Sequence, residues 1–425
     1  MGQENINSTD RFEQLAANTA FARLAASEQE FLREQSRSLR FTQQEIQQLS
    51  DISLDRQQWK EAPLAKSWPA AVRENDQRRL KKRLLAQVRE AHENLKSTPR
   101  DYLQFDKKQD TPPTQKPILK VEVKPQLGLG RCPVASERTR CCNLLTLDAV
   151  EKCGFDCSYC SIQSFYHGNE VVFDQGFSDK LRNLKLDPDK TYHIGTGQSS
   201  DSLMWGNKQG VLEALCDFAE RNPNVILELK TKSKNIGWLL KNDYPANILC
   251  TWSLNPQTII DHEEHRSASL SERLDCAEKI TAKGRLVGFH FHPIIAYQGW
   301  HRGYEDIGEQ LTERFDPASV ALVSMGTLTY AKSVMKTIRQ RPFKSKILQM
   351  PLVETAGKYS YPTETKLDMF QTVYRSLRPW HAMVFFYLCM EPADLWQPVF
   401  GFQYENNIAL EKAMKQAYLD KIVAL

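Results

Sequence analysis

The stretch CGFDCSYCSIQSFY, from Cys153 to Tyr166, places three cysteines at positions 153, 157 and 160. A structural zinc site usually has four protein ligands, whereas a catalytic zinc site keeps one position open. An iron–sulfur cube is also held by thiolates, and three of them leave one iron without a protein ligand. The spacing therefore indicates a metal site with an open position, and zinc, an iron–sulfur cluster and unligated thiols are the alternatives.

The composition is that of an ordinary globular protein. The 425 residues are 41% hydrophobic and 25% charged, and the net charge of +4 is too small to indicate a nucleic-acid or membrane partner by itself. The start of the chain has no apolar core of the signal-peptide type, and no apolar run of roughly 18 residues occurs. We therefore expect a cytoplasmic protein that spans no membrane and keeps its cysteines mostly reduced.

Residues 1–105 are polar and predict a helical, basic N-terminal extension. Residues 76–96 have apolar side chains at helical spacing, namely Leu80, Leu84, Val88, Ala91 and Leu95. The opposite face, called here the basic face, carries Arg78, Arg79, Lys81, Lys82, Arg83 and Arg89. This face is either the solvated side of a docked helix or a surface that contacts phosphates. Residues 106–118 contain three prolines among charges and predict a linker.

From residue 119 to residue 425, short apolar runs alternate with amphipathic helical stretches. The expected strands are residues 143–150, 191–197, 224–232, 247–255, 285–295 and 319–328, with 382–390 as an extra late strand. The expected helices between them include residues 209–222, 269–284 and 303–315. Such alternation implies parallel strands joined by crossover helices. Six units do not close an eight-stranded barrel, so we expect an α/β fold, a partial (β/α)6 barrel with a C-terminal extension.

Chemistry-bearing residues follow the expected strands, where the sites of such barrels gather. The three cysteines follow the first strand, and the motifs GTGQSSD, KTK, SLN and HFHP end the next four. Gly195 and Gly197 allow a ligand to approach the backbone closely, and Ser253 and Asn255 alternate off the same strand face. We expect Asp201 to organise the loop after the second strand.

The cysteine spacing after the first strand of a partial barrel resembles that of the radical S-adenosylmethionine (SAM) enzymes. The motifs CGFDCSYC, HIGTGQSSDSL, LELKTKSKNI, TWSLNP, EEHRSASLSERL and VGFHFHPIIAYQGW together resemble the spore photoproduct lyase family of these enzymes, from about Cys132 to Tyr361. The resemblance implies a [4Fe-4S] cluster on Cys153, Cys157 and Cys160, and reductive cleavage of SAM to a 5′-deoxyadenosyl radical that abstracts hydrogen. It also implies a reductant such as flavodoxin or ferredoxin. In the lyase branch of this family the substrate is a thymine dimer in ultraviolet-damaged DNA.

The resemblance also assigns residues to the cofactor. Ser200, Lys232 and Ser253 match family residues that contact SAM, and an ammonium at a strand end can hold carboxylate or ribose oxygens. Tyr159 is placed to pack on the adenine, with an ordinary core aromatic as the alternative. The remaining residues expected around the cofactor are Gly195, Gly197, Gln198 and Asn255.

Three positions depart from the lyase branch. Gln198 stands where that branch has a cysteine that returns a hydrogen atom to the product radical, and a carboxamide cannot do this. Thr329 replaces an arginine that helps to seat the lesion, and Ser161 replaces a tyrosine of the hydrogen relay. Cys389, on the late strand, is a candidate replacement donor, with a small buried hydrophobe as the alternative. His292 is a candidate for contact with the substrate.

For several other residues the sequence allows two interpretations. Cys132, Cys141 and Cys142 form a second thiol group, which is either a metal or redox site or a set of structural thiols. His290 is either a hydrogen-bonded core histidine or a residue of the barrel interior. Tyr297, Trp300 and Tyr304 form either an aromatic floor for a base or the packing of a loop. Cys216, Cys250 and Cys276 are expected in the core.

We therefore expect a radical SAM enzyme whose substrate is a damaged or modified nucleic acid. A radical SAM enzyme acting on a peptide or small molecule is the first alternative, supported by Gln198 and Thr329. A non-catalytic iron–sulfur protein for electron transfer or regulation is the second alternative, and it would bind SAM weakly or not at all.

Overall fold

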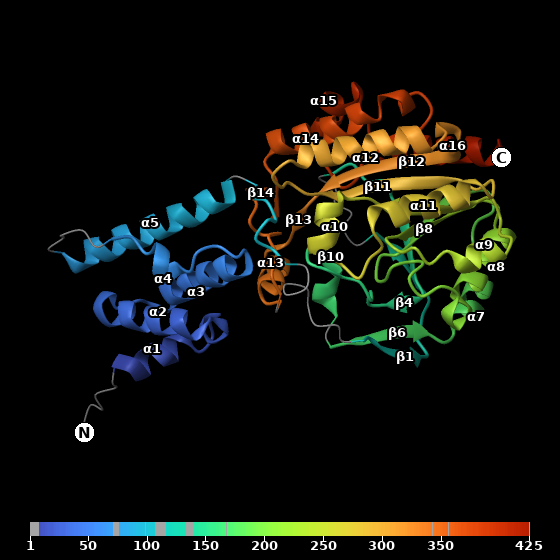
Figure 1. The fold of residues 1–425 in the computed structure, drawn as a ribbon. Helices are drawn as coiled ribbons and strands as arrows, with labels where there is room; N and C mark the ends of the chain where they lie inside the picture. Colours follow the sequence, from blue (N-terminus) through green and yellow to red (C-terminus); the bar gives the residue numbers. More distant parts are fainter. Residues whose placement is uncertain are drawn as a thin grey trace. The chain divides into compact units, whose positions relative to one another are not determined.

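The computed structural model describes residues 8–70, 76–97, 99–106, 116–132, 139–166, 168–341, 343–355 and 357–424. The chain divides into two compact units, whose elements are labelled in Figure 1. The helical unit comprises Met1–Pro112 with Ala331–Tyr359, and the barrel unit comprises Pro113–Tyr330 with Ser360–Leu425. The membership of residues 331–359 in the helical unit was not predicted. The expected boundaries at residues 105 and 118 stay a prediction, and residues 107–115 of the expected linker lie outside the described residues.

The helical unit consists of short amphipathic helices around an apolar core. Its elements are α1 (Ser8–Ala16), α2 (Ala26–Leu39), α3 (Gln43–Gln58), α4 (Leu64–Ser67), α5 (Gln77–Ser97), α13 (Lys332–Arg339) and the short strand β14 (Val353–Thr355). Helix α3 begins with a capping box, in which Thr42 and Glu45 satisfy each other's backbone amides. In α13, the Arg339 guanidinium lies 2.7 Å from the buried carboxylate of Asp55 on α3.

Helix α5 carries the apolar stripe expected from the sequence, with one correction. Leu84 and Val88 are buried, but Ala91 is exposed and His92 is buried in its place. The predicted position of Ala91 is wrong because His92, although polar, finds an acidic partner and an aromatic ring in the core. Its Nε2 atom lies 3.4 Å from Asp55 and its ring stacks on a tryptophan of α3's C-cap.

The barrel unit is built on one eight-stranded sheet, in the order β16-β12-β11-β9-β8-β7-β3-β2. Its strands are β2 (Gly128–Arg131), β3 (Leu145–Asp148), β7 (Tyr192–Thr196), β8 (Val225–Thr231), β9 (Ile248–Ser253), β11 (Val287–Ile294), β12 (Val320–Thr327) and β16 (Phe385–Leu388). All neighbours pair in parallel except the edge strand β2, which is antiparallel to β3. The expected α/β partial barrel is confirmed, and β2 is the one strand of this sheet that was not predicted.

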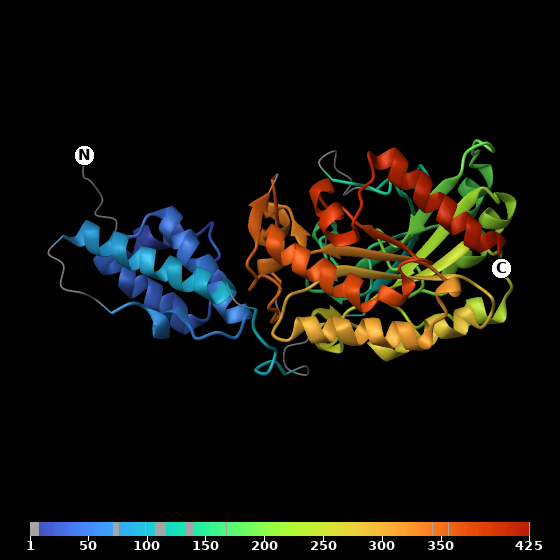
Figure 2. The same cartoon turned by 90° about the horizontal axis from the view of Figure 1, so that it is seen from above.

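Helices connect these strands and cover the outside of the sheet. They are α7 (Phe177–Asn183), α8 (Val211–Arg221), α9 (Gly237–Lys241), α10 (Gln257–Glu263), α11 (Leu270–Thr281), α12 (Trp300–Arg314), α14 (Thr363–Ser376), α15 (Trp396–Phe400) and α16 (Asn407–Val423). Figure 2 shows α12 and α14 running along the strands in the view from above. No helix in the described part of the chain is long and apolar enough to cross a bilayer.

Several short strands lie outside the main sheet and were not predicted. The strands β1 (Ile118–Glu122), β6 (Glu170–Asp174) and β4 (Val150–Glu151) form a small sheet, and β5 (Asp156–Cys157) pairs with β10 (Glu264–His265). The strands β13 (Thr329–Tyr330) and β15 (Lys358–Ser360) lie where the chain passes between the units. Strands of two to five residues are too short to show a readable alternation.

The C-terminal helix α16 packs on the amino-terminal end of the barrel. The Lys415 ammonium donates to the carbonyl of Thr191, next to β7, at 2.7 Å, and the Lys421 ammonium donates to Val320 of β12 at 2.5 Å. Between them, the fully buried Tyr418 packs edge-on against His193. With this end of the barrel covered, a ligand of the interior is expected at the carboxyl end of the strands, where the sites of such folds lie.

Candidate active site

The cysteine loop, residues 153–160, is held by a segment far along the chain. Within the loop, β5 pairs antiparallel with β10, and this places Cys157 opposite Glu264. The Ser158 amide donates to the carbonyl of Glu263 at 2.8 Å. The backbone that presents the thiols is therefore fixed by the segment that follows α10.

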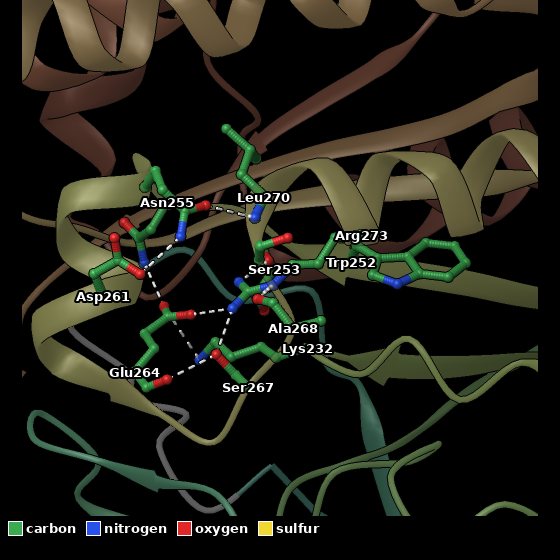
Figure 3. A network of polar contacts seen from close by, with 12 residues as sticks. Lys232, Trp252, Ser253, Asn255, Asp261, Glu264, Ser267, Ala268, Leu270 and Arg273 are labelled. Carbon is green, nitrogen blue, oxygen red and sulfur yellow. Dashed lines mark hydrogen bonds and ion pairs between the residues drawn. The ribbon is translucent and has the colours of Figure 1, made fainter. Parts of the chain in front are cut away.

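Glu264 is the centre of a buried polar network, shown in Figure 3. One carboxylate oxygen lies 2.5 Å from the Arg273 guanidinium. The other accepts hydrogen bonds from the Asn255 amide at 2.7 Å and from the Tyr159 hydroxyl, and it lies 3.8 Å from the Lys232 ammonium. A single carboxylate thus joins the cysteine loop, the end of β8 and the segment after β9.

Arg273 has hydrogen-bond partners beyond Glu264. It donates to the carbonyl of Ala268 at 2.9 Å, to the carbonyl of Ser253 at 2.7 Å and to the Ser267 hydroxyl at 2.7 Å. Arg273 is 0% exposed, and burying a charge is costly unless it is paired and hydrogen-bonded. The network meets both conditions, so it is a rigid support rather than a solvated ion pair.

Tyr159 and Lys232 face each other inside this support. The Lys232 ammonium lies 5.0 Å from the centroid of the Tyr159 ring, within cation–π distance. The Tyr330 hydroxyl donates to the backbone carbonyl of Tyr159 at 3.2 Å. Burial acts to lower the pKa of Lys232, but the neighbouring Glu264 outweighs it and the pKa is raised. Lys232 is therefore a fixed cation beside the cysteine loop.

Asp201 organises the loop after β7, as expected. Its carboxylate accepts hydrogen bonds from the amides of Leu203 at 3.0 Å and Met204 at 2.9 Å. It also accepts from the Thr231 hydroxyl and from the Lys232 amide, both at 2.7 Å. The loop is thereby fastened to the carboxyl end of β8.

The two glycines of GTG have different reasons to be glycine. Gly197 has a φ of +91°, and a Cβ there would lie 2.7 Å from the Lys230 carbonyl and 2.8 Å from the Ser202 hydroxyl. At Gly195 a Cβ would lie 2.9 Å from the side chain of Leu144. Gly197 thus allows the loop to approach β8, whereas Gly195 allows packing between neighbouring strands.

Most of the residues predicted from the sequence line one cavity of about 280 Å³ at the carboxyl ends of the strands. These are Cys153, Cys157, Tyr159, Cys160, Gly197, Gln198, Ser200, Lys232, Ser253, His292 and Cys389. Gly195 and Asn255 are not among the lining residues. The structure therefore brings together the three cysteines, the expected cofactor residues and both candidate catalytic residues, whose roles stay predictions.

Asn255 and the aromatic residues after β11 lie away from the cavity. Asn255 is fully buried, donates to Glu264 and accepts a hydrogen bond from the Tyr304 hydroxyl at 2.6 Å. Tyr297, Trp300 and Tyr304 are buried and do not line the cavity. Of their two readings, packing of the loop is the one that the structure supports.

Below the cysteines, a charged layer fills the barrel interior. Glu228 on β8 accepts hydrogen bonds from His193 at 2.9 Å, His290 at 2.7 Å and Thr251 at 2.9 Å. Burial and the nearby Lys230 lower the pKa of His290 to about 4. Burial opposes ionisation of Glu228, but the two histidines outweigh it and hold its pKa well below the usual range. His290 is thus a hydrogen-bonded histidine of the barrel interior.

A second group of thiols shares the cavity. Cys132, Cys141 and Cys142 line it together with Cys389. A backbone bridge between residues 140 and 391 brings the two segments side by side. A hydrogen bond with Cys142 lowers the pKa of Cys141 to about 6, whereas burial raises the pKa of Cys389 to about 12. Cys216, Cys250 and Cys276 are buried in the core, as expected.

Sequence reasoning assigned no role to four charged residues of the site. Glu264 and Arg273 lie in a motif that carried the family resemblance but received no role. Glu228 and Lys230 lie in the strand ELKTK, where charged residues alternate with others. Since alternate strand residues share a face, this pattern was the available signal for a charged barrel interior.

The residues present fit an iron–sulfur cluster. Three thiols line one cavity beside the Lys232 cation, and thiolates are the ligands of such clusters. Within the described residues, no three His, Cys, Asp or Glu side chains converge closely enough to hold a single metal ion. A cluster spreads its thiolate ligands over several iron atoms, so the spacing favours a [4Fe-4S] cluster over a lone zinc ion.

Comparisons with known proteins agree with this geometry. The spore photoproduct lyase of Clostridium acetobutylicum is 26% identical over 225 residues, which cover 51% of this chain and 64% of that protein. The spore photoproduct lyase of a Geobacillus species is 26% identical over 216 residues, which cover 49% of this chain and 62% of that protein. The chain thus spans less than two thirds of the length of these curated relatives.

Solved structures show the same fold. A spore photoproduct lyase complexed with a dinucleoside spore photoproduct aligns with a TM-score of 0.54 at 19% identity, over 64% of this chain and 82% of that one. A double mutant of a spore photoproduct lyase with bound AdoMet and the dinucleoside aligns with a TM-score of 0.53 at 20% identity over the same shares. The family model described as spore photoproduct lyase matches residues 152–377, more than half of the 425 residues. The chain therefore belongs to the spore photoproduct lyase family.

Proposed function

We propose that the protein is a cytoplasmic radical SAM enzyme that binds a [4Fe-4S] cluster through Cys153, Cys157 and Cys160. The observation that carries the proposal is that these three thiols share one cavity with Lys232 and Tyr159 at the carboxyl ends of the barrel strands. When bound, the cluster and SAM supply a 5′-deoxyadenosyl radical that can take a hydrogen atom from a carbon of the substrate. A reductant such as flavodoxin or ferredoxin provides the electron.

The side chains around the cluster bind and orient SAM. Lys232 is a fixed cation suited to the carboxylate or ribose oxygens of SAM, since Glu264 and Tyr159 hold it from two sides. Tyr159, oriented by its hydrogen bond to Glu264, offers a ring face to the adenine. The hydroxyls of Ser200 and Ser253 line the same cavity and add polar contacts.

The substrate that we propose is a damaged or modified nucleic acid. The curated relatives are spore photoproduct lyases, and the basic face of α5 is largely exposed. Because Gln198 cannot return a hydrogen atom, we assign this step to Cys389, which lines the cavity. In this step the S–H bond of Cys389 breaks as a C–H bond forms on the product radical, and the unpaired electron passes to sulfur.

A second candidate function is a radical SAM reaction on a peptide or small molecule. Gln198 and Thr329 favour it, since they occupy the positions where the lyase branch resembled by this sequence has a hydrogen donor and a lesion-seating arginine. The non-catalytic alternative remains distinct, because it requires a cluster without turnover of SAM.

One anaerobic experiment separates the three functions. The protein is reconstituted with iron and sulfide, reduced, and given SAM with or without ultraviolet-irradiated DNA, and 5′-deoxyadenosine is quantified. We expect the nucleoside to form and irradiated DNA to increase it. Formation without a DNA effect would favour the second candidate, and no formation with an intact cluster would leave the non-catalytic reading. Cys157→Ala should abolish iron–sulfur absorbance, whereas the matched control Cys250→Ala, at a buried cysteine outside the cavity, should retain it.

A further inference from the structure

Lys230 is a cation of the cavity that has no counter-ion among the described residues. It lies near the end of β8, two positions before Lys232, and lines the same cavity. In the described residues, its ammonium has no carboxylate or other acceptor within ion-pair or hydrogen-bonding distance. Glu228, the nearest acid on its own strand face, is already engaged by two histidines and a threonine. A cation placed in this way is available to a ligand.

Two polar atoms of other residues that line this cavity also have no hydrogen-bond partner in the described part of the chain. Ser324 on β12 is 0% exposed, and its hydroxyl has no hydrogen-bond partner among the described residues. His290 on β11 directs Nε2 to Glu228 and leaves a buried Nδ1 atom similarly unpartnered there. His290 and Ser324 pair in register on adjacent strands, and both line the cavity. Buried polar groups are nearly always hydrogen-bonded, so the Ser324 hydroxyl points to a bound group. Because His290 donates through Nε2, its Nδ1 atom is an acceptor and does not itself bind an anion.

The chemistry of these groups selects an anion. A lysine ammonium and a serine hydroxyl donate hydrogen bonds, and a carboxylate or phosphate has the acceptor oxygens to receive them. We infer that Lys230 and Ser324 form a subsite that binds a carboxylate or phosphate group of the substrate. The inference rests on the proposed function in one respect, because it takes this cavity to be the place where the substrate lies. Lys232 then serves the cofactor and Lys230 serves the substrate.

The test uses the purified full chain without added SAM. Its melting temperature is measured in chloride, acetate or inorganic phosphate at equal ionic strength, for the wild type, Lys230→Met, and the control Lys241→Met at an exposed lysine of α9. We expect acetate or phosphate to raise the melting temperature of the wild type and of the control by a few degrees, because a ligand of the native state stabilises it. Lys230→Met should lose this shift, and Ser324→Ala should reduce it. The anion with the larger effect identifies the group.

A second result separates a binding residue from a structural one. Because Lys230 is a largely buried cation that has no partner in the part of the chain that the structure describes, Lys230→Met should raise the melting temperature in chloride. A lower melting temperature in chloride would make Lys230 a structural residue and overturn the inference. An equal anion shift in the wild type and in Lys230→Met would mean that the anion binds elsewhere, and would overturn it too.

Adding SAM distinguishes the subsite from the cofactor site. The anion shift of the wild type should persist in the presence of SAM, and its loss would assign Lys230 to the cofactor and overturn the inference. The change in melting temperature caused by the anion needs no turnover. If it occurs in a protein that forms no 5′-deoxyadenosine, the proposed function is wrong and the subsite is supported. If the anion does not change the melting temperature of a protein that forms 5′-deoxyadenosine, only the proposed subsite is wrong.

Discussion

Glu264 and Arg273 form a fully buried charge pair, and we predict that Glu264→Gln strongly destabilises the barrel unit. Glutamine keeps the shape of the side chain but removes the counter-ion of Arg273, which is 0% exposed. Removing one partner of a buried ion pair costs about 3–5 kcal/mol, because the remaining charge stays desolvated without compensation. At about 2–4 °C per kcal/mol, the melting temperature should fall by roughly 10 °C.

Two comparisons isolate the buried charge as the cause. Glu272→Gln, on helix α11, removes a salt bridge to Lys234 between largely exposed side chains, and should cost about 0–1 kcal/mol. Glutamine at this position also preserves the capping box with Ser269. The double variant Glu264→Met with Arg273→Met should cost less than Glu264→Gln alone, since Lys232 loses its carboxylate partner in both variants but only Glu264→Gln also leaves the fully buried guanidinium unpaired.

The assay is urea unfolding of the iron-free protein, combined with amide hydrogen exchange of two peptides. A peptide across β9 and β11 reports the barrel core, and a peptide over residues 153–166 reports the cysteine loop. We expect Glu264→Gln to accelerate exchange most in the loop, because Tyr159 loses its charged partner. If Glu264→Gln lost no more free energy of unfolding than Glu272→Gln, or if the double variant were the less stable one, the buried-charge argument would be refuted.

Three further predictions follow from the structure. Gly197→Ala should cost at least about 1–2 kcal/mol more than Gly210→Ala in urea unfolding, because both glycines have positive φ but only Gly197 faces a clash. Lowering the pH from 7 to 4 should reduce the free energy of unfolding by about 1–3 kcal/mol through His290. The folded pKa of His290, about 4, lies below its unfolded value, so the unfolded state binds the proton first as the pH falls. His290→Gln should flatten this dependence, and an unchanged slope would contradict the assignment. Reversing three charges of the basic face should weaken DNA binding. The slope of the logarithm of the binding constant against the logarithm of the salt concentration should fall in magnitude by about 0.9 for each phosphate that the protein no longer neutralises. Unaltered binding would show that this face is not a DNA-binding surface. The three residues are Arg79, Lys82 and Arg83.

The barrel could be predicted from the sequence because its strands carry a local signal. Apolar runs of buried parallel strands, separated by amphipathic helices, can be recognised without knowing their partners. The grouping of residues 331–359 with the N-terminal helices has no such signal, since it depends on interactions between distant segments, such as that of Arg339 with Asp55. The error at Ala91 has a similar cause: His92 is buried against Asp55 and a tryptophan ring from a distant helix, and composition alone favours the alanine.

The candidate site was predictable where a motif carried it. The spacing of the three cysteines and the position of Lys232 after a strand led to one cavity. Glu264 was missed because its partners come from four separate segments, with Tyr159 lying 105 positions away. Asn255 was expected in the cofactor site because strand alternation shows on which side of the strand a residue lies, but not how deeply it is buried. In the structure, its side-chain amide is hydrogen-bonded to Glu264 and Tyr304.

The alternation of charges on β8 is also an argument about the substrate. Glu228 and Lys230 lie on one face of β8, Lys232 directly follows the strand, and each is costly to bury in a barrel interior. Glu228 is compensated by two histidines, and Lys232 by Glu264, whereas Lys230 has no counter-ion in the described residues. A substrate without an anionic group would leave this cation unpaired in the complex, where an apolar residue would bind better. If the proposed subsite holds, Lys230 constrains the substrate more directly than the glutamine at position 198, because it requires an anionic group on the ligand.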